Sequence, residues 1–230
     1  MKRVPLIHRI GLALGLLLLP ARQAPAQAFS AFYEVGFKNE RLATQTVTIA
    51  RANGLTTVSA AFEADLPVFI ALHHYAEKLS ATFGADGTVE RLAARRQDGP
   101  MQVSVSGSRQ PNGRLRIVRT DMEGTTTSLV ARADYDFNSL AIYAMAPADF
   151  LTTNNPARVL SVADGRVEPV AIQMISESDT FERQHLESTH LVWTAGNFVS
   201  HSWHPERFSN LPRRYVRQTE NGEFTFTLIR

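Results

Sequence analysis

Apolar and polar residues alternate along most of the chain, and this period of two is the pattern of half-buried β-strands. Near the start of the pattern, Tyr33, Val35 and Phe37 alternate with Glu34 and Gly36. The same period recurs in residues 44–50, 55–64, 101–106 and 114–120. These strands do not alternate with long helical patterns, so a parallel α/β sheet is not expected.

Turn-forming residues separate the alternating stretches. Asn53-Gly54 is the strongest of these signals, because Asn and Gly tolerate the positive φ angles of a tight hairpin turn. Further turn signals are Ala85-Asp86-Gly87, Asp98-Gly99-Pro100, Pro111-Asn112-Gly113, Ala163-Asp164-Gly165, Ala195-Gly196 and Asn221-Gly222. Strands joined in this way predict an all-β fold, an antiparallel curved sheet that is barrel-like or arranged as a sandwich.

Residues 65–79 fit two kinds of secondary structure. Asp65 could cap a helix, whereas a strand would place His73, Tyr75 and Glu77 on one face. Strands flank the segment on both sides, so a strand is the favoured prediction.

Near the middle of the chain, residues 144–156 carry Pro147, Asn154-Asn155 and Pro156 and predict a loop or a short helical turn. The segment is neither long nor rich in Gly and Ser, so it is not interpreted as a domain linker. We therefore expect a short irregular or helical segment within one β-rich domain.

The N-terminus has the three parts of a secretory signal peptide. Lys2, Arg3 and Arg9 form a positive start, Ile10–Leu19 is apolar, and Ala26-Gln27-Ala28 fits a small-residue cleavage site. The apolar run is shorter than the about 20 residues that span a bilayer, which weakens the alternative of an uncleaved anchor. Residues 1–28 are predicted to be cleaved, leaving 29–230 as an exported domain, periplasmic or secreted, with no membrane span of its own.

Export changes the charge of the chain. The full sequence has 24 basic and 22 acidic residues, a net charge of +2 and a pI of 9.1. Removing Lys2, Arg3, Arg9 and Arg22 leaves 20 basic residues against 22 acidic ones, a net charge of −2. The mature chain lacks the basic footprint of nucleic-acid binding, so no nucleic-acid partner is expected.

Several chemistries are absent from the sequence. There is no cysteine, which excludes disulfides, thiolate metal sites and a cysteine nucleophile. No G-x-S-x-G, P-loop, H-E-x-x-H or G-x-G-x-x-G motif occurs, and Ser104, Ser106 and Ser108 are interpreted as surface strand serines. The sequence does not exclude a Ser-His-Asp site, because a triad is defined by its geometry in space and not by the order of its residues in the chain. We assign no catalytic residue and expect no cofactor.

Histidine is the remaining metal-ligating residue type. The mature chain contains His73, His74, His185, His190, His201 and His204. No two of them have the i, i+2 spacing that places two ligands on one face of a strand. Ligands could still converge from different strands, but the spacing favours ordinary surface or partly buried histidines, and no metal site is assigned.

Two polar groups are candidate ligand sites. His73, Tyr75 and Glu77 share a strand face, with Arg91 or Arg95 available from the next strand; in a cavity they would orient a polar ligand head. The alternative is a solvated outer face with cross-strand charge pairs. A second group is basic: Arg213, Arg214 and Arg217 cluster beside Tyr215 and could bind an anionic headgroup. The alternative is that these arginines form a solvated rim of the sheet.

A series of short segments occurs in a characteristic order along the mature chain: Phe32-Tyr33-Glu34-Val35, Val58–Phe62, His74-Tyr75-Ala76-Glu77, Gly87–Leu92, Arg96-Gln97-Asp98-Gly99, Val103–Gly107, Leu191–Val199 and Asn221-Gly222. This order resembles exported bacterial proteins of domain-of-unknown-function family 6134. The resemblance covers most of the mature chain, and it implies an antiparallel, curved, barrel-like sheet in the cell envelope without assigning catalytic residues.

The leading functional expectation is a non-enzymatic, barrel-like protein of the periplasm that binds an apolar or amphipathic small molecule, since a curved sheet of this length can enclose a ligand. One alternative is a structural or protein-interaction module of the envelope, with an unknown partner. The other is a hydrolase, His-dependent or metal-assisted.

Overall fold

The computed structural model describes residues 27–37, 40–68, 71–150, 156–181, 184–196, 198–205, 210–219 and 222–229. The predicted signal peptide lies outside the described residues except for Gln27 and Ala28, so its cleavage stays a prediction.

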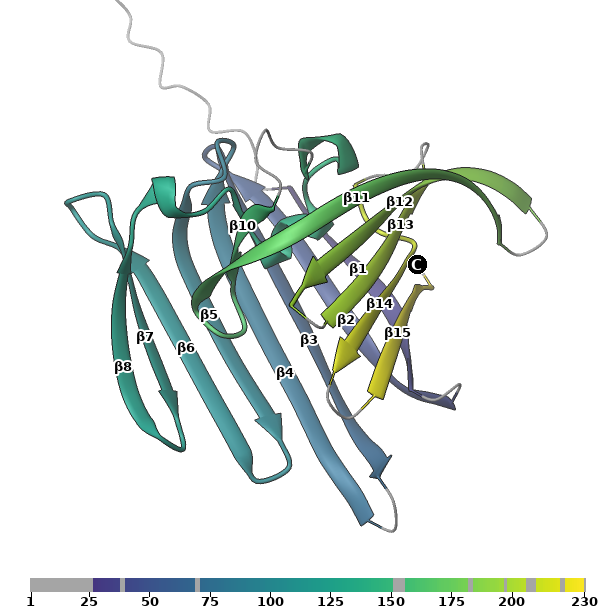
Figure 1. The fold of residues 1–230 in the computed structure, drawn as a ribbon, viewed down its shortest axis with the longest axis horizontal. Coiled ribbons are helices and arrows are strands. Elements are labelled where there is room, and N and C mark those ends of the chain that lie inside the picture. Colours follow the sequence, from purple (N-terminus) through teal and green to yellow (C-terminus); the bar gives the residue numbers. More distant parts are fainter. Residues whose placement is uncertain are drawn as a thin grey trace, which may run out of the picture.

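Fifteen strands of the described residues form one curved sheet in the order β8-β7-β6-β5-β4-β3-β2-β1-β15-β14-β13-β12-β11-β10-β9 (Figure 1). Consecutive strands are neighbours in the sheet except β8 and β9, and β1 pairs with β15, which joins the first and last strands. All pairs are antiparallel except β9 with β10. The sheet does not close, because β8 and β9 are its two edges, and the all-β curved prediction is confirmed.

The strands are β1 (Gln27–Phe37), β2 (Glu40–Ala52), β3 (Leu55–Val68), β4 (Ala71–Gly84), β5 (Val89–Asp98), β6 (Met101–Arg109), β7 (Leu115–Asp121), β8 (Gly124–Val130), β9 (Phe137–Asn138), β10 (Ala157–Ser161), β11 (Arg166–Phe181), β12 (Gln184–Ala195), β13 (Phe198–Pro205), β14 (Arg214–Thr219) and β15 (Gly222–Leu228).

The ambiguous segment 65–79 is β-structure, but it belongs to two strands. β3 extends to Val68 and β4 begins at Ala71, and these two residues face each other in the antiparallel pair. The chain therefore reverses between them, at residues 69–70, which lie outside the described part. A single strand through this segment is wrong, whereas the shared face of Tyr75 and Glu77 is confirmed.

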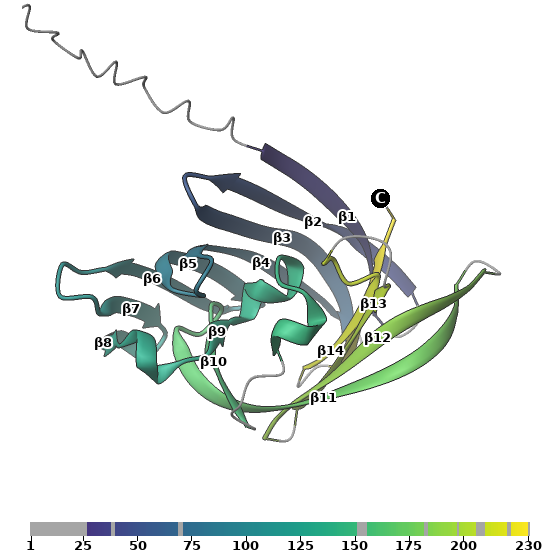
Figure 2. The same cartoon turned by 90° about the horizontal axis from the view of Figure 1, so that it is seen from above.

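Short 3₁₀ helices fill the middle of the chain, and no α-helix occurs in the described ranges. They are η1 (Arg132–Asp134), η2 (Ser139–Tyr143) and η3 (Pro147–Phe150). Seen from above, they lie with β9 and β10 inside the curve, between the β1–β8 half of the sheet and the β11–β15 half (Figure 2). The expected helical segment is thus confirmed, and it serves as filling for the concave side.

The strand pattern follows from which residues turn inward. In β1, Ala31, Tyr33, Val35 and Phe37 are buried while the residues between them are more exposed. Asn53 and Gly54 form the β2–β3 turn with φ of 53° and 75°, the angles that Asn-Gly tolerates.

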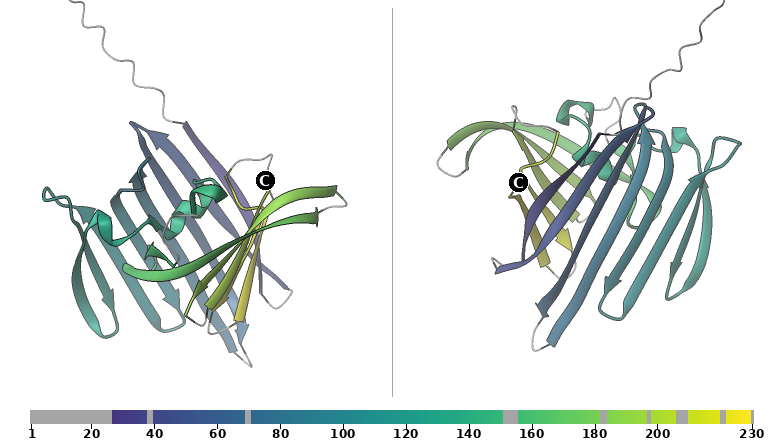
Figure 3. Two further views of the ribbon diagram at one scale, coloured as in Figure 1. Left: turned by 45° about the horizontal axis from the view of Figure 1, so that its top comes forward. Right: turned by 180° about the vertical axis from the view of Figure 1, so that it is seen from behind.

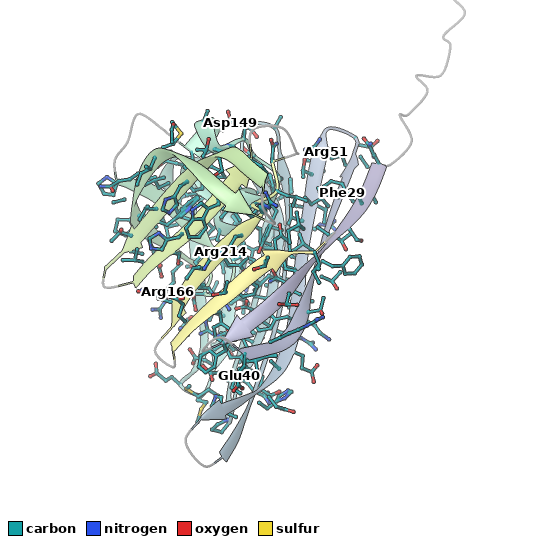
Figure 4. All side chains as sticks on the ribbon, turned by 90° about the vertical axis from the view of Figure 1, so that its right-hand side faces the viewer. Phe29, Glu40, Arg51, Asp149, Arg166 and Arg214 are labelled. Atoms are coloured by element: carbon teal, nitrogen blue, oxygen red, sulfur yellow. The ribbon has the colours of Figure 1, made fainter. Side chains whose placement is uncertain are left out.

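The opposite, outer face of the sheet is open. Seen from behind, β2 to β7 have no strand or helix of the described chain in front of them (Figure 3, right). The side view shows Phe29 and Arg51 at one end of the β1–β2 pair and Glu40 at the other end (Figure 4). Two faces can therefore carry function: a concave one covered by η1–η3, and an open one.

Candidate functional site

Tyr75 and Glu77 lie on the inner face of β4, where Arg217 of β14 joins them. The Arg217 Nη1 donates to Glu77 Oε2 at 2.8 Å, and its Nη2 donates to the Tyr75 hydroxyl at 3.3 Å. The Tyr75 hydroxyl in turn donates to Glu77 Oε1 at 3.3 Å. Arg217, Tyr75 and Glu77 thus form a closed triangle of hydrogen bonds. The Glu77 side chain in it is only 3% exposed.

Burial and charge set the protonation of this triangle. Burial by itself lowers the pKa of Arg217, but Glu77, Tyr75 and Tyr215 together hold that pKa well above its usual value. Burial also raises the pKa of Tyr75, although Arg217 offsets part of the rise. The triangle is therefore a guanidinium and a neutral phenol around one carboxylate.

Aromatic rings surround the guanidinium. The Arg217 Cζ lies 5.9 Å from the ring centroids of Phe62 and Phe224 and 5.7 Å from that of Phe226, within cation–π range. Phe62 also stacks on Tyr75, with centroids 5.3 Å apart. The polar atoms thus bond mainly to one another inside an aromatic wall, which is the arrangement of an internal ion pair.

The other two members of the predicted group, His73 and Arg91, are not part of this triangle. The His73 ring bonds to the Asp98 carboxylate on β5. Arg91 is exposed on the opposite face of β5, because strand residues alternate and its neighbour Leu92 points inward. The expectation that Arg91 approaches His73, Tyr75 and Glu77 is wrong, and Arg217 from a distant strand takes that place.

The predicted basic cluster is also divided. Arg217 points inward, while Arg214, three residues earlier, lies over the outward Trp203 ring at 5.1 Å. The Arg213 backbone N–H donates to the Trp203 carbonyl at 2.7 Å. Residues three apart on a strand face opposite sides, so Arg213, Arg214 and Arg217 do not form one headgroup site.

Two of the histidines contact each other, and no group of three metal-ligating residues occurs within the described ranges. His190 Nε2 lies 3.0 Å from His201 Nδ1, and His190 stacks on Trp203 with centroids 4.5 Å apart. His74 contacts Asp65 at 3.0 Å and Glu63 at 3.7 Å on the outer face. The side chain of His185 lies outside the described part.

Side chains fill the concave side of the sheet. The largest fully buried ones include Tyr33, Tyr135 and Phe150. The Tyr33 hydroxyl donates to the Pro212 carbonyl at 2.8 Å, and the Tyr135 hydroxyl accepts from the Val89 N–H at 2.9 Å. The β10–β11 turn also enters this layer. A ligand enclosed behind Tyr75 and Glu77 would have to displace these packed groups.

Gly165 in the β10–β11 turn tests this packing. Its φ is +66°, and an added Cβ would lie 2.8 Å from both Ile117 Cγ2 and Val105 Cγ1. We expect Gly165→Ala to lower the free energy of unfolding by about 1–3 kcal/mol more than Gly113→Ala does in urea titrations. Gly113 is the matched control because its φ is +78° with nothing within 4 Å. Equal losses in the two variants would mean that the turn does not fill the interior.

The outer face carries a second constellation, set by the strand register. Lys78 of β4 stands directly opposite Arg95 of β5, and Arg95 stands opposite Ser104 of β6. Cβ atoms of directly opposed residues are about 4.5–5.5 Å apart, and like charges there are destabilising. Both cations are exposed, and neither has an ion pair or hydrogen bond within the part of the chain that the structure describes.

Two further rows lie beside this cation pair. The next row along the strands, which we call the small-residue row, consists of Ser59, Ser80, Ala93, Ser106, Val118 and Thr127. The row after it contains Arg91 and Arg116, separated by Ser108. Rows are about 6.7 Å apart along a strand. Four exposed cations thus border a floor of short side chains. Glu90 of β5 also lies on this face, beside Arg91, and it is 3.0 Å from Arg109.

The face is hollowed at the cation pair. A hollow of about 830 Å³ and another of about 570 Å³ share Lys78, Arg95, Ser104 and Thr120 in their linings. We call the two together the outer-face trough. Neither is lined by Tyr75 or Glu77.

The carboxylates at the larger hollow already have partners. Glu63 lies 3.7 Å from the His74 ring, and Asp121 lies 2.9 Å from Arg119. The charged groups of Lys78 and Arg95 are therefore available to bind an external anion or water.

Sequence patterns did not reveal Lys78 and the rows around it as a site. The available signal was the run of outward serines and alanines between cations, which resembles any solvated strand face until the register is known.

No family model, curated protein or solved structure matches the chain. The resemblance to family 6134 therefore stays a prediction from the residues that carry it. Within the described ranges, no helix is long and apolar enough to cross a membrane.

Proposed function

We propose that the exported chain is a non-catalytic binding protein that holds an amphipathic anion in the outer-face trough. The observation that carries the proposal is the opposed pair of Lys78 and Arg95, which has no carboxylate partner among the described residues and lies where the two hollows meet. Two like charges held opposite each other repel, and an anion between them turns that repulsion into two charge-assisted contacts.

The floor of the trough supports an amphipathic ligand over a simple ion. Ser80, Ser104 and Ser106 supply hydroxyl donors, while Ala93 and Val118 supply apolar surface beside them. A charged oxyanion head would sit between the cations, and a short apolar portion would lie along the small-residue row.

The open face suits this role better than the concave side. The concave side is filled by side chains, and the Glu77–Arg217 pair satisfies the charges there. The proposal keeps the amphipathic ligand expected from the sequence and moves its site to the other face of the sheet. It takes the periplasmic location from the N-terminal pattern and the family resemblance.

A charge reversal at Arg95 tests the site. We expect Arg95→Glu to weaken binding of dodecyl phosphate at least about tenfold, because a charged contact contributes about 1.5–3 kcal/mol. The same variant should unfold at equal or slightly higher urea, since the introduced carboxylate would face Lys78 as an opposite-charge pair. Titration calorimetry, repeated at high salt to screen the charges, measures the first effect.

Arg114→Glu is the matched control, because it makes the same charge change at an exposed position in the β6–β7 turn. It should leave binding near the wild-type value. Inorganic phosphate should bind more weakly than dodecyl phosphate, and an uncharged dodecyl ether should not bind. Equal weakening by both variants, or tight binding of the ether, would contradict an anion site at Lys78 and Arg95.

A further inference from the structure

β8 is an unprotected edge of the sheet. Gly124–Val130 contains no charged residue and no proline, and six of its seven residues are exposed. Figures 1 and 3 show no strand of the described chain beyond it. Natural sheets usually protect edges with charge, proline or short strands. The other edge, β9, follows this rule because it has two residues.

The free hydrogen-bonding groups of β8 belong to alternate residues. Met122 and Glu123 form a two-residue turn, and Asp121 pairs with Gly124 beside it. The pair that closes such a turn is hydrogen-bonded, and bonded and non-bonded pairs then alternate. Thr125, Thr127 and Leu129 therefore direct their backbone N–H and C=O groups away from β7.

We propose that two copies of this chain pair through β8, antiparallel, about a two-fold axis at Thr127. Thr125 would then stand opposite Leu129 of the partner subunit, and Thr127 would stand opposite its own copy. This register pairs only residues with free backbone groups, so every outward N–H and C=O of the three finds a partner. A two-fold interface needs a self-complementary surface. β8 provides one, because it is uncharged and its free backbone groups are evenly spaced on either side of Thr127.

The side chains fit the same arrangement. Leu129 is 51% exposed and would be covered by a threonine of the second copy. Thr120 and Thr125 already bond through their hydroxyls at 3.0 Å across β7 and β8, which shows how threonines pair on this face. Because the strand carries no charge, the pairing brings no like charges together.

Pairing would also join the two troughs. The small-residue row ends at Thr127, which lies on the proposed axis, so the row continues into the same row of the second copy. The dimer would present one continuous floor across both sheets, with the cation pairs of the two copies on opposite sides of the axis.

Sedimentation velocity of the mature chain tests the pairing. We expect a concentration-dependent dimer for the wild type. Thr127→Lys and Thr127→Glu should each weaken dimerisation at least about tenfold, because each places like charges at the axis. An equimolar mixture of the two variants should sediment as a dimer again. Thr44→Lys, at an exposed position of β2, is the control and should sediment as the wild type.

A wild-type chain that sediments as a monomer at its highest soluble concentration would overturn the proposal. A dimer that persists in Thr127→Lys would overturn it as well, because the contact would lie elsewhere. Dodecyl phosphate binding per chain is measured separately, so loss of the dimer and loss of the trough are distinguishable.

Discussion

Replacing Glu77 with glutamine is expected to lower the free energy of unfolding by about 3–5 kcal/mol, because breaking a buried ion pair leaves its other charge uncompensated. The carboxylate is 3% exposed and accepts from both Arg217 and Tyr75. Glutamine keeps the shape but not the charge, and its single acceptor oxygen cannot replace both carboxylate oxygens, which accept separately from Arg217 and Tyr75. The Arg217 guanidinium is then left among three phenylalanine rings without an opposite charge in the triangle.

Urea unfolding measures this loss, and a surface pair provides the control. Glu34 and Arg41 are 3.1 Å apart with side chains 41% and 61% exposed, so Glu34→Gln should change stability by at most about 1 kcal/mol. A double variant, Glu77→Leu with Arg217→Met, should recover most of the loss, because an apolar pair of similar volume replaces the charges. If Glu77→Gln behaved like Glu34→Gln, the triangle would not contribute to holding β4 and β14 together.

The triangle shows which contacts can be predicted from a sequence pattern and which cannot. A period of two is local, so it correctly placed Tyr75 and Glu77 on one face. Their partner Arg217 lies 140 residues from Glu77, and its approach depends on β1 pairing with β15. No local pattern contains that closure, so the sequence predicts only a cation of the neighbouring strand, Arg91 or Arg95.

The outer-face trough depends on a single irregularity in register. Pairing in β4–β5 shifts between Thr82 and Phe83, so Arg95 rather than Ala94 stands opposite Lys78. Counting along the strands from the Phe83–Val89 pair without this bulge would place Ala94 there. The sequence does carry a trace of the bulge, since buried positions jump from Val89 to Leu92 before alternation resumes.

The filling of the concave side was predictable only in outline. Residues 144–156 lacked a strand pattern, which indicated an irregular segment. That the neighbouring η2 supplies Leu140 and Tyr143 to the core requires the curvature of the whole sheet. An amphipathic pattern of five residues is too short to reveal a buried face.

His204 joins three parts of this interior by hydrogen bonds. Trp193 Nε1–H donates to Ser202 Oγ at 3.2 Å, and Ser202 can donate onward to His204 Nε2 at 3.1 Å. On its other side, His204 Nδ1 lies 3.2 Å from the Asn210 carbonyl. The Asn210 amide donates to the Ala144 carbonyl at 2.9 Å, at the end of η2. A neutral imidazole with its proton on Nδ1 satisfies every one of these contacts.

Protonation of His204 would break that chain, because Nε2–H and the Ser202 hydroxyl could not both donate. Burial lowers the pKa of His204 from 6.5 to about 4. The unfolded chain therefore binds a proton near pH 6.5 and the folded chain only near pH 4, so stability is full above pH 6.5 and is lost as pH falls toward 4. We expect the free energy of unfolding to fall by about 3 kcal/mol more over this window in the wild type than in His204→Gln, which removes the titrating group and leaves the carboxylates in place. Urea unfolding at a series of pH values gives the two slopes, and NMR titration of the His204 ring gives its midpoint directly. Parallel slopes, or a ring midpoint near 6.5, would show that the folded chain accepts the charged imidazole.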